Sequence, residues 1–550
     1  MNDVAGRLRT LARARARSAR RAWAEAAPLW DEVVTANPVN GEHWDRLAEA
    51  RFGLGEYRAA LPAYERVLAL GVSPDRETSR PGAVPYQIAR CRARLGDVDG
   101  ALDAVRAALA AGFRDVQRVR GDEHLAALRG DPRLAELLGG PAAGGDGREE
   151  GWRGDLALLA REAKRRRPPA RTREAEERFD AQVALLGERI PQLTDAQVFV
   201  ELWRLLRPLE DGHARVLVPD PDHELNHLLP VQFYLFEEGL FVTAAAPGYE
   251  ALLGAQVRAF DGTATEEVMT VVEPVITRDN DYGPRHNLPT WLRRTAVLHA
   301  LGVTGDSAKA TLTVTAADGE RREVSLPAAA GAVDGFPAPP GWRFLPDTLS
   351  EPVPLSLRNA GCCYWFEYLP ADRLVYLQLN NIMNDPDEPL ADFTDRLFSF
   401  IEEYPVDRLV IDLRWNGGGN TFLATGLLRR LLSCAKLGRR GSLFLVVGRR
   451  TFSAAQNTAT LIERYTDAVV VGEPTGSRPN FTGETAPFLL PHSRLRVNIS
   501  DLYWQSSFPM DSRTAIAPDL YVPPTFDDFR SNRDPVMEAI RSCTEHLPGW

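Results

Sequence analysis

Apolar residues recur with the spacing of amphipathic helices through the N-terminal part of the chain. Three of these segments align with one another at a spacing of roughly 34 residues, and a Pro- and Gly-rich insertion lengthens the second interval. In this alignment a small residue occupies one position, and a larger apolar residue follows it one helical turn later. The aligned residues are Ala26, Ala60 and Ala101, followed by Trp30, Tyr64 and Val105.

The helices before the second and third segments end at Gly55 and Gly96, which suit the left-handed residue after a helix. The pattern resembles tetratricopeptide repeats and predicts an α-helical solenoid over residues 1–138, with an unrelated helical bundle as the alternative. Such a module has no catalytic chemistry, and we expect it to bind a protein partner or substrate. The stretch GGPAAGGDGREEG, residues 139–151, is expected to be a flexible linker.

Helical periodicity resumes after the linker, and residues 152–218 are expected to be mainly helical. Thr194 with Gln197 forms a capping-box pattern at the start of one helix, and Gly212 is suited to ending it. His213 is therefore expected at a corner between this helix and a strand. On local evidence alone, such a histidine is structural more often than catalytic.

Short strand patterns separated by turns fill residues 219–335. Their order resembles a PDZ-type peptide-binding module, with a plain β-rich insertion as the alternative. Residues 336–550 instead alternate strands with helices, and the continuous apolar runs RLVIDL and LFLVV predict strands buried on both faces. We therefore expect a multidomain α and α/β protein whose C-terminal region is an α/β domain.

Composition and charge exclude several classes of function. The chain has 550 residues, a net charge of −10 and 44% hydrophobic residues, which gives no general attraction for nucleic acid or an anionic membrane. The sequence contains no run of ~20 apolar residues and no signal-peptide pattern. Its five cysteines are scattered, which favours a reducing compartment. A cytoplasmic protein is expected.

Two loops of the predicted α/β domain carry candidate chemistry at the C-terminal ends of strands. Ser453 precedes a helix and, with Gln456, matches a capping box, so it either caps the helix or acts as a nucleophile at its N-terminus. The loop Gly417, Gly418 and Gly419 permits close approach of a ligand to free N–H groups. A phosphate-binding loop is not indicated, because the G-K-[ST] pattern is absent.

A second motif points to different chemistry. His223, Glu224 and His227 match H-E-x-x-H, which places two zinc ligands one helical turn apart. Pro221 and Pro230 leave only about two turns for the helix that this chemistry needs. A zinc peptidase is therefore a minor alternative, and no metal or cofactor is expected.

The segments VIDLRWNGGGN, LFLVVGRRTFSAAQ and VVVGEPTG together resemble the S41 family of serine peptidases, which includes tail-specific and tricorn-type proteases. The resemblance covers residues 152–542 and implies a ClpP/crotonase-like core with Ser453 as nucleophile. Arg478 stands where tail-specific members carry a lysine base, and arginine cannot become a neutral base. The resemblance to the tricorn-type branch implies His213, in LEDGHARV, as the base instead.

The resemblance further implies an acidic residue near the C-terminus, for which Asp511 is the first candidate and Asp519 the second. A role for Asp511 in a turn is an equal alternative. The implied activity is peptide hydrolysis through an acyl-enzyme. Its oxyanion hole would be formed by the Ala454 N–H and one N–H from Gly417 to Gly419. The main alternative is a catalytically inactive scaffold that binds peptides.

Overall fold

The computed structural model describes residues 4–72, 78, 80, 82–113, 115–138, 147–166, 173–330, 338–485 and 487–543. Contacts divide the chain into two compact units. The N-terminal unit holds residues 1–167 with residues 486–493, and the C-terminal unit holds residues 168–485 with residues 494–550. Among the described residues, no helix is both long enough and apolar enough to cross a membrane.

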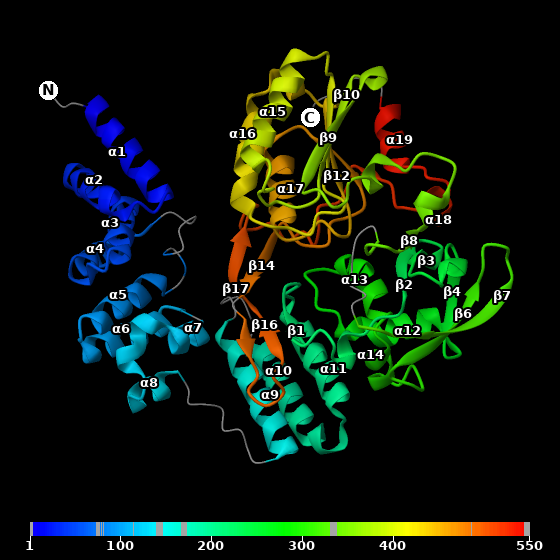
Figure 1. The fold of residues 1–550 in the computed structure, drawn as a ribbon, viewed down its shortest axis with the longest axis horizontal. Coiled ribbons are helices and arrows are strands. Elements are labelled where there is room, and N and C mark those ends of the chain that lie inside the picture. Colours follow the sequence, from blue (N-terminus) through cyan, green and yellow to red (C-terminus); the bar gives the residue numbers. More distant parts are fainter. Residues whose placement is uncertain are drawn as a thin grey trace. The chain divides into compact units, whose positions relative to one another are not determined.

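Antiparallel helical hairpins make up the N-terminal unit, and α1 packs on α2, α3 on α4, and α5 on α6 (Figure 1). The aligned small residues Ala26, Ala60 and Ala101 are all 0% exposed, so the predicted helix contacts are confirmed. Membership in the tetratricopeptide class stays a prediction. The helices are α1 (Val4–Ala19), α2 (Trp23–Ala36), α3 (Gly41–Gly53), α4 (Tyr57–Leu70), α5 (Ala83–Arg94), α6 (Val98–Ala110), α7 (Val116–Gly121), α8 (Pro132–Leu137) and α9 (Arg148–Arg165).

Both predicted helix-ending glycines are confirmed, since Gly55 and Gly96 have φ of 77° and 81° directly after the C-caps of α3 and α5. The predicted linker is only partly described, because residues 139–146 lie outside the described residues. Residues 148–151 belong to α9, so this part of the linker prediction is wrong. The buried Trp152 and Leu156 on the following turns explain why the helix begins before them.

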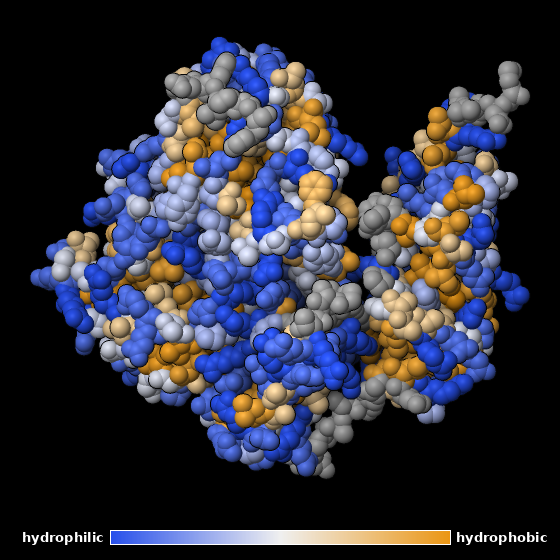
Figure 2. Space-filling model, turned by 180° about the vertical axis from the view of Figure 1, so that it is seen from behind, coloured by the Kyte–Doolittle hydropathy of each residue, from blue (hydrophilic) through white to orange (hydrophobic). Residues whose placement is uncertain are grey.

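Residues 487–493 return to the N-terminal unit from far along the sequence. They include β15 (Phe488–Leu489), and Asp155 on α9 accepts hydrogen bonds from the backbone N–H groups of His492 and Ser493 at 3.0 and 2.8 Å. On the face shown in Figure 2, hydrophobic residues interrupt the hydrophilic surface of this unit. Its exposed large side chains include Leu54, Leu68, Leu70 and Leu95.

The C-terminal unit begins with α10 (Arg173–Arg189) and α11 (Asp195–Leu206). The predicted capping box of Thr194 and Gln197 is confirmed, with both reciprocal hydrogen bonds present. The predicted helix end at Gly212 is wrong. The α-helix gives way to a 3-10 turn at Arg207–Leu209 because Pro208 has no N–H to donate, and Glu210 takes the left-handed conformation at φ 50°.

An antiparallel sheet of order β2-β3-β4-β6-β7 follows, with β5 paired to β4 and β8 paired to β3. The region is therefore β-rich as predicted, while its likeness to a PDZ module stays a prediction. Its strands are β2 (Val231–Phe236), β3 (Gly239–Ala245), β4 (Gln256–Phe260), β5 (Thr263–Ala264), β6 (Lys309–Thr315), β7 (Arg321–Pro327) and β8 (Arg343–Phe344). The helices α12 (Thr265–Val272), α13 (Gly283–Trp291) and α14 (Thr295–Ala300) lie between β5 and β6 in the chain.

The predicted α/β domain is confirmed as a six-stranded sheet of order β18-β13-β12-β11-β10-β9, parallel except for the pair β9 and β10. Every residue of β12 is buried, and every residue of β11 except Arg408 is buried, as the apolar runs LFLVV and RLVIDL predict. The strands are β9 (Tyr364–Leu369), β10 (Leu374–Leu379), β11 (Arg408–Asp412), β12 (Leu443–Val447), β13 (Val469–Gly472) and β18 (Leu520–Tyr521). The helices are α15 (Leu390–Glu403), α16 (Thr425–Ser433), α17 (Ala454–Tyr465), α18 (Phe526–Phe529) and α19 (Pro535–Ser542).

Two small antiparallel pairs complete this unit. β1 (Arg215–Leu217) pairs with β16 (Arg496–Asn498), and β14 (Asn480–Thr485) pairs with β17 (Ser500–Gln505). The parallel neighbours β11 and β12 end at the same edge of the main sheet, where the glycine loop and the segment GRRTFS follow them. The fold therefore brings the two candidate loops to one place, as the sequence predicts.

Candidate active site

Ser453 occupies a sharp turn between β12 and α17, with φ 55° and ψ −126°. Non-glycine residues rarely adopt this conformation, which costs on the order of 1–3 kcal/mol and tends to occur at functional sites. The Ser453 side chain makes no capping hydrogen bond, and the Gln456 amide donates to Thr460 instead. The capping-box interpretation is therefore wrong, because an N-cap residue needs an extended backbone. A serine on a strained strand-to-helix turn has the geometry of a nucleophile elbow.

This strain predicts an unusual order of stabilities. Ser453→Gly is expected to be more stable than Ser453→Ala by about 1 kcal/mol, because glycine adopts a positive φ without a steric cost. Urea unfolding of the two variants, fitted with a common slope, measures this difference. Equal stabilities would contradict a strained turn at this position.

The glycine loop after β11 lies directly against Ser453. A Cβ placed on Gly418, where φ is 126°, would lie 2.7 Å from the Ser453 Cβ and 3.1 Å from its Oγ. A Cβ on Gly419 would lie 2.2 Å from the carbonyl oxygen of Ile382. Both positions therefore require glycine. A Cβ would clash with a neighbouring segment, and the positive φ is strained for other residues.

The N–H groups of this loop differ in what they contact. The Gly418 N–H donates to the Asn416 side chain at 2.8 Å, so it is already engaged. Within the described residues, no acceptor is recorded for the N–H groups of Ala454, Gly417 and Gly419. Of the residues predicted to form an oxyanion hole, these three keep a free donor, whereas Gly418 provides space for the hydroxyl.

Gly418→Ala is expected to lower the reactivity of Ser453 at least 100-fold, because the added methyl would displace the serine side chain and strain the loop. The rate of covalent labelling by a fluorophosphonate measures this change. Gly426→Ala is the matched control, since a Cβ on Gly426 meets no atom within 4 Å. Labelling of Gly418→Ala at the rate of the wild type would contradict the close packing described above.

His213 lies beside the residue that precedes the serine. Its ring centroid is 4.4 Å from that of Phe452, and its ring stacks on Phe481 at 5.8 Å and 10°. A Cβ on Gly212 would lie 2.8 Å from Phe452, so the chain before His213 also packs closely on this side chain. The structure therefore brings the corner carrying His213 next to the Ser453 turn, although within the described residues no hydrogen bond joins the two side chains.

Burial lowers the pKa of His213 to about 4, and the charge of Arg215 acts in the same direction. The imidazole is thus neutral at ordinary pH, which is the form that a general base requires. Its Nδ1 is buried and has no hydrogen-bond partner in the described part of the chain.

Two carboxylates that the sequence analysis did not single out flank His213. Asp211 Oδ1 lies 4.0 Å from His213 Nδ1, and both Asp211 oxygens accept hydrogen bonds from Ser500 at 2.8 Å. Asp279 accepts from the Gly212 N–H at 2.6 Å and from the Ser477 hydroxyl. Asp211 lies two residues before His213 in the LEDGH segment, so the sequence could indicate that the two are close. Nothing in the sequence around Asp279 indicates that it lies near His213.

Asp211, His213 and Asp279 are the group in the described residues whose ligand atoms lie close enough to hold a metal ion, within 4.8 Å of one another. Their carboxylate oxygens already accept hydrogen bonds from backbone N–H groups and serine hydroxyls. Burial raises the pKa of Asp279 to about 7, against the effect of these hydrogen bonds. The cluster is therefore explained as a hydrogen-bonded support for the 211–213 corner.

Arg478, which the family resemblance aligns with the lysine base of tail-specific members, forms structural contacts in this chain. It pairs with Glu210 at 3.1 Å and donates to the backbone carbonyl of Asp279 at 2.6 Å. Both partners lie on segments that support His213. Arg478 therefore connects the segment after β13 to the corner of the predicted base.

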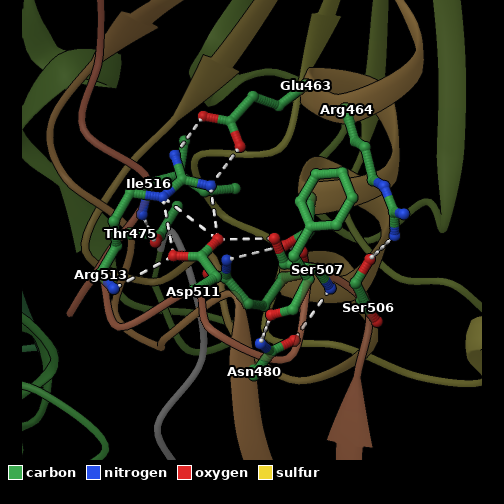
Figure 3. A network of polar contacts seen from close by, with 12 residues as sticks. Glu463, Arg464, Thr475, Asn480, Ser506, Ser507, Asp511, Arg513 and Ile516 are labelled. Carbon is green, nitrogen blue, oxygen red and sulfur yellow. Dashed lines mark hydrogen bonds and ion pairs between the residues drawn. The ribbon is translucent and has the colours of Figure 1, made fainter.

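The structure gives Asp511 partners other than His213 (Figure 3). Asp511 accepts a hydrogen bond from Ser507 at 2.5 Å and pairs with Arg513, which also pairs with Glu463 on α17. Arg513 holds the pKa of Asp511 far below its ordinary value. No contact in the described residues supports Asp511 as the partner of His213. The second candidate, Asp519, accepts from the Val470 N–H on β13.

The H-E-x-x-H segment does not have the geometry of a zinc site. Glu224 to Asn226 form one 3-10 turn, not a sustained helix. His223 Nδ1 accepts from the Leu225 N–H at 3.2 Å, and His227 Nε2 lies 2.9 Å from the Asp222 carbonyl oxygen. Both imidazoles thus take part in local turn contacts, as expected where prolines interrupt a helix.

Comparison with known proteins gives results at the level of fold. No family model and no curated protein sequence matches the chain. Mature CPAF complexed with lactacystin is similar with a TM-score of 0.51 and 12% identity, covering 72% of this chain and 98% of that one. A second structure of mature CPAF gives 0.51 and 13%, covering 72% and 99%.

A putative S41 protease from Bacteroides fragilis NCTC 9343 covers 61% of this chain and 86% of its own, at a TM-score of 0.30 and 14% identity. The chain shares the fold of mature CPAF. The resemblance to S41 peptidases rests on the sequence segments that carry Ser453 and the glycine loop. At these identities the comparison concerns the fold alone.

Proposed function

We propose that the chain is a serine peptidase that hydrolyses peptide bonds through an acyl-enzyme on Ser453. The observation that carries this proposal is the strained Ser453 turn, whose hydroxyl is not used as a helix cap and faces the glycine loop. A strained serine without a capping role is more costly than a simple helix cap, so a chemical role accounts for it better.

In the proposed mechanism the neutral imidazole of His213 accepts the Ser453 proton as Oγ attacks the peptide carbonyl. In this mechanism the hydroxyl and the imidazole form their hydrogen bond when substrate binds, since catalytic hydrogen bonds are often long in apo structures and tighten in the Michaelis complex. The Ala454 N–H and that of Gly417 or Gly419 stabilise the oxyanion. The imidazolium then protonates the leaving amine, and water releases the acyl group.

Asp211 is the better supported candidate for the third residue of the site. Its carboxylate lies 4.0 Å from His213 Nδ1 and accepts the backbone N–H of His213 at 2.9 Å. Asp511 remains the candidate implied by family resemblance. The variants Asp211→Asn and Asp511→Asn, compared for hydrolysis rate and melting temperature, decide between the two.

Denatured β-casein is a suitable test substrate because it offers many unfolded peptide bonds. Full-length protein is expected to generate new peptide termini, detected by mass spectrometry, in the presence of EDTA. A folded protein that binds casein without generating termini would favour the inactive scaffold. In the described part of the chain, no hydrogen bond joins Ser453 to His213. This observation favours the inactive scaffold as the second candidate function.

The helical hairpins of the N-terminal unit are proposed to bind a protein partner or substrate. A cytoplasmic location stays a prediction from the sequence.

A further inference from the structure

A cavity of about 240 Å³ lies beside the candidate active site. Its lining includes Gly212, which precedes His213, and also Trp415 and Arg450 from the two loops of the site. Arg450 is close to the glycine loop, since its Nε would lie 3.9 Å from a Cβ on Gly417. A group bound in this cavity therefore lies against the segment that carries the candidate nucleophile, since Arg450 precedes Ser453 by three residues.

The charged residues of this lining are all cationic. It includes arginines from β1, from α13 and the loop after it, and from the Ser453 turn, and none of the described residues that line it is an aspartate or glutamate. This is unusual in a chain with a net charge of −10. The arginines are Arg215, Arg285, Arg293, Arg294 and Arg450.

Two of these arginines are available to a ligand. Arg215 on β1 and Arg285 on α13 are both exposed, and neither forms a salt bridge within the described residues. The acid that acts on Arg215 is Asp211, whose oxygens already accept hydrogen bonds from Ser500 and the His213 N–H. Both guanidinium groups therefore keep donors that can bind an anion.

The same positive field acts on His286, which also lines the cavity. Burial lowers the pKa of His286 to about 3, and Arg450, Arg449 and Arg215 act in the same direction. His286 thus adds a neutral polar group without adding charge. Trp415 and Tyr234 add aromatic surface to the same wall.

We propose that this arginine-lined cavity is a substrate subsite that binds the carboxylate of an acidic side chain of the peptide. Guanidinium groups suit this task because their planar set of donors matches the two oxygens of a carboxylate. A carboxylate held there fixes the peptide relative to Ser453. This inference rests on the proposed peptidase function and names its substrate class.

Binding to full-length Ser453→Ala tests the subsite without requiring hydrolysis. The probes are four pools of degenerate hexapeptides with a neutral dye at the N-terminus. They carry Glu or Gln at the third position, and a free or amidated C-terminus. We expect at least tenfold tighter binding of the Glu amide pool than of the Gln amide pool, with the difference shrinking as salt is raised.

The pools separate a bound side chain from a bound C-terminus. Preference for the Glu amide pool supports the proposed subsite, whereas a stronger preference for the Gln free-acid pool would assign the cavity to the C-terminus and overturn the proposal. Equal binding of all four pools would overturn the proposal. A separate failure of the peptidase function would appear as a lack of casein cleavage by the wild type.

The residues are tested by Arg215→Gln with Arg285→Gln in the Ser453→Ala background, which is expected to reduce the preference to less than threefold. The charge-preserving change of both residues to lysine should keep most of it. Arg429→Gln on α16 is the matched control, being an exposed arginine outside the cavity. An unchanged preference in the double glutamine variant would overturn the proposal. If that variant does not fold, the salt dependence and the lysine variant decide.

Discussion

Ser453→Ala is expected to reduce casein hydrolysis by at least ~10³-fold, because the acyl-enzyme cannot form without the hydroxyl. The variant should fold like the wild type, since the Ser453 side chain makes no capping hydrogen bond that the change would remove. The rate of appearance of new termini measures the effect.

Ser433→Ala is the matched control for this experiment. Ser433 is exposed at the end of α16, and its hydroxyl donates only to the Arg430 carbonyl at 3.1 Å. Its hydrolysis rate should equal that of the wild type. Hydrolysis that persists at a similar rate in Ser453→Ala would assign the activity to another residue or to a contaminating protease.

His213→Gln is expected to reduce hydrolysis by a similar factor, because serine has no other base next to it in the proposed mechanism. His223→Gln serves as the control, since His223 belongs to the H-E-x-x-H segment and takes part only in a local turn. Loss of activity in His223→Gln and not in His213→Gln would contradict the proposed base. It would also return attention to the zinc alternative.

The pH dependence of the wild type gives an independent check on His213. Only the neutral imidazole accepts a proton, and the pKa of His213 is lowered from 6.5 to about 4. The value of kcat/KM should therefore fall as the pH drops through about 4, whereas an unperturbed histidine would lose activity near 6.5. Circular dichroism at each pH separates this change from acid unfolding.

Much of the fold could be predicted because local patterns determine it. Continuous apolar runs favour strands buried on both faces, and β12 is buried in full and β11 is buried except at Arg408. The predicted end of α11 at Gly212 is wrong because glycine is only one way to end a helix. Pro208 and the left-handed Glu210 end it earlier. Gly212 is required instead by its close approach to Phe452, which no local pattern reveals.

Only part of the candidate site can be predicted from the sequence, for a similar reason. Ser453 and the glycine loop follow adjacent parallel strands, so topology alone brings them together. The surroundings of His213 depend on contacts between segments far apart in sequence, such as the one between Asp279 and Gly212. Asp511 illustrates the same limit, because its neighbour Arg513 and the nearby Ser507 occupy its carboxylate. The sequence does not show which of several acidic residues faces the imidazole.

The central claim is that Ser453 is an activated nucleophile in the folded protein. The most direct measurement is fluorophosphonate labelling of full-length wild type, followed by mass spectrometry of the peptide that contains Ser453. We predict near-stoichiometric phosphonylation of Ser453 in the native protein and none after unfolding in urea. Native protein with a cooperative melting transition and no adduct on Ser453 would contradict the claim.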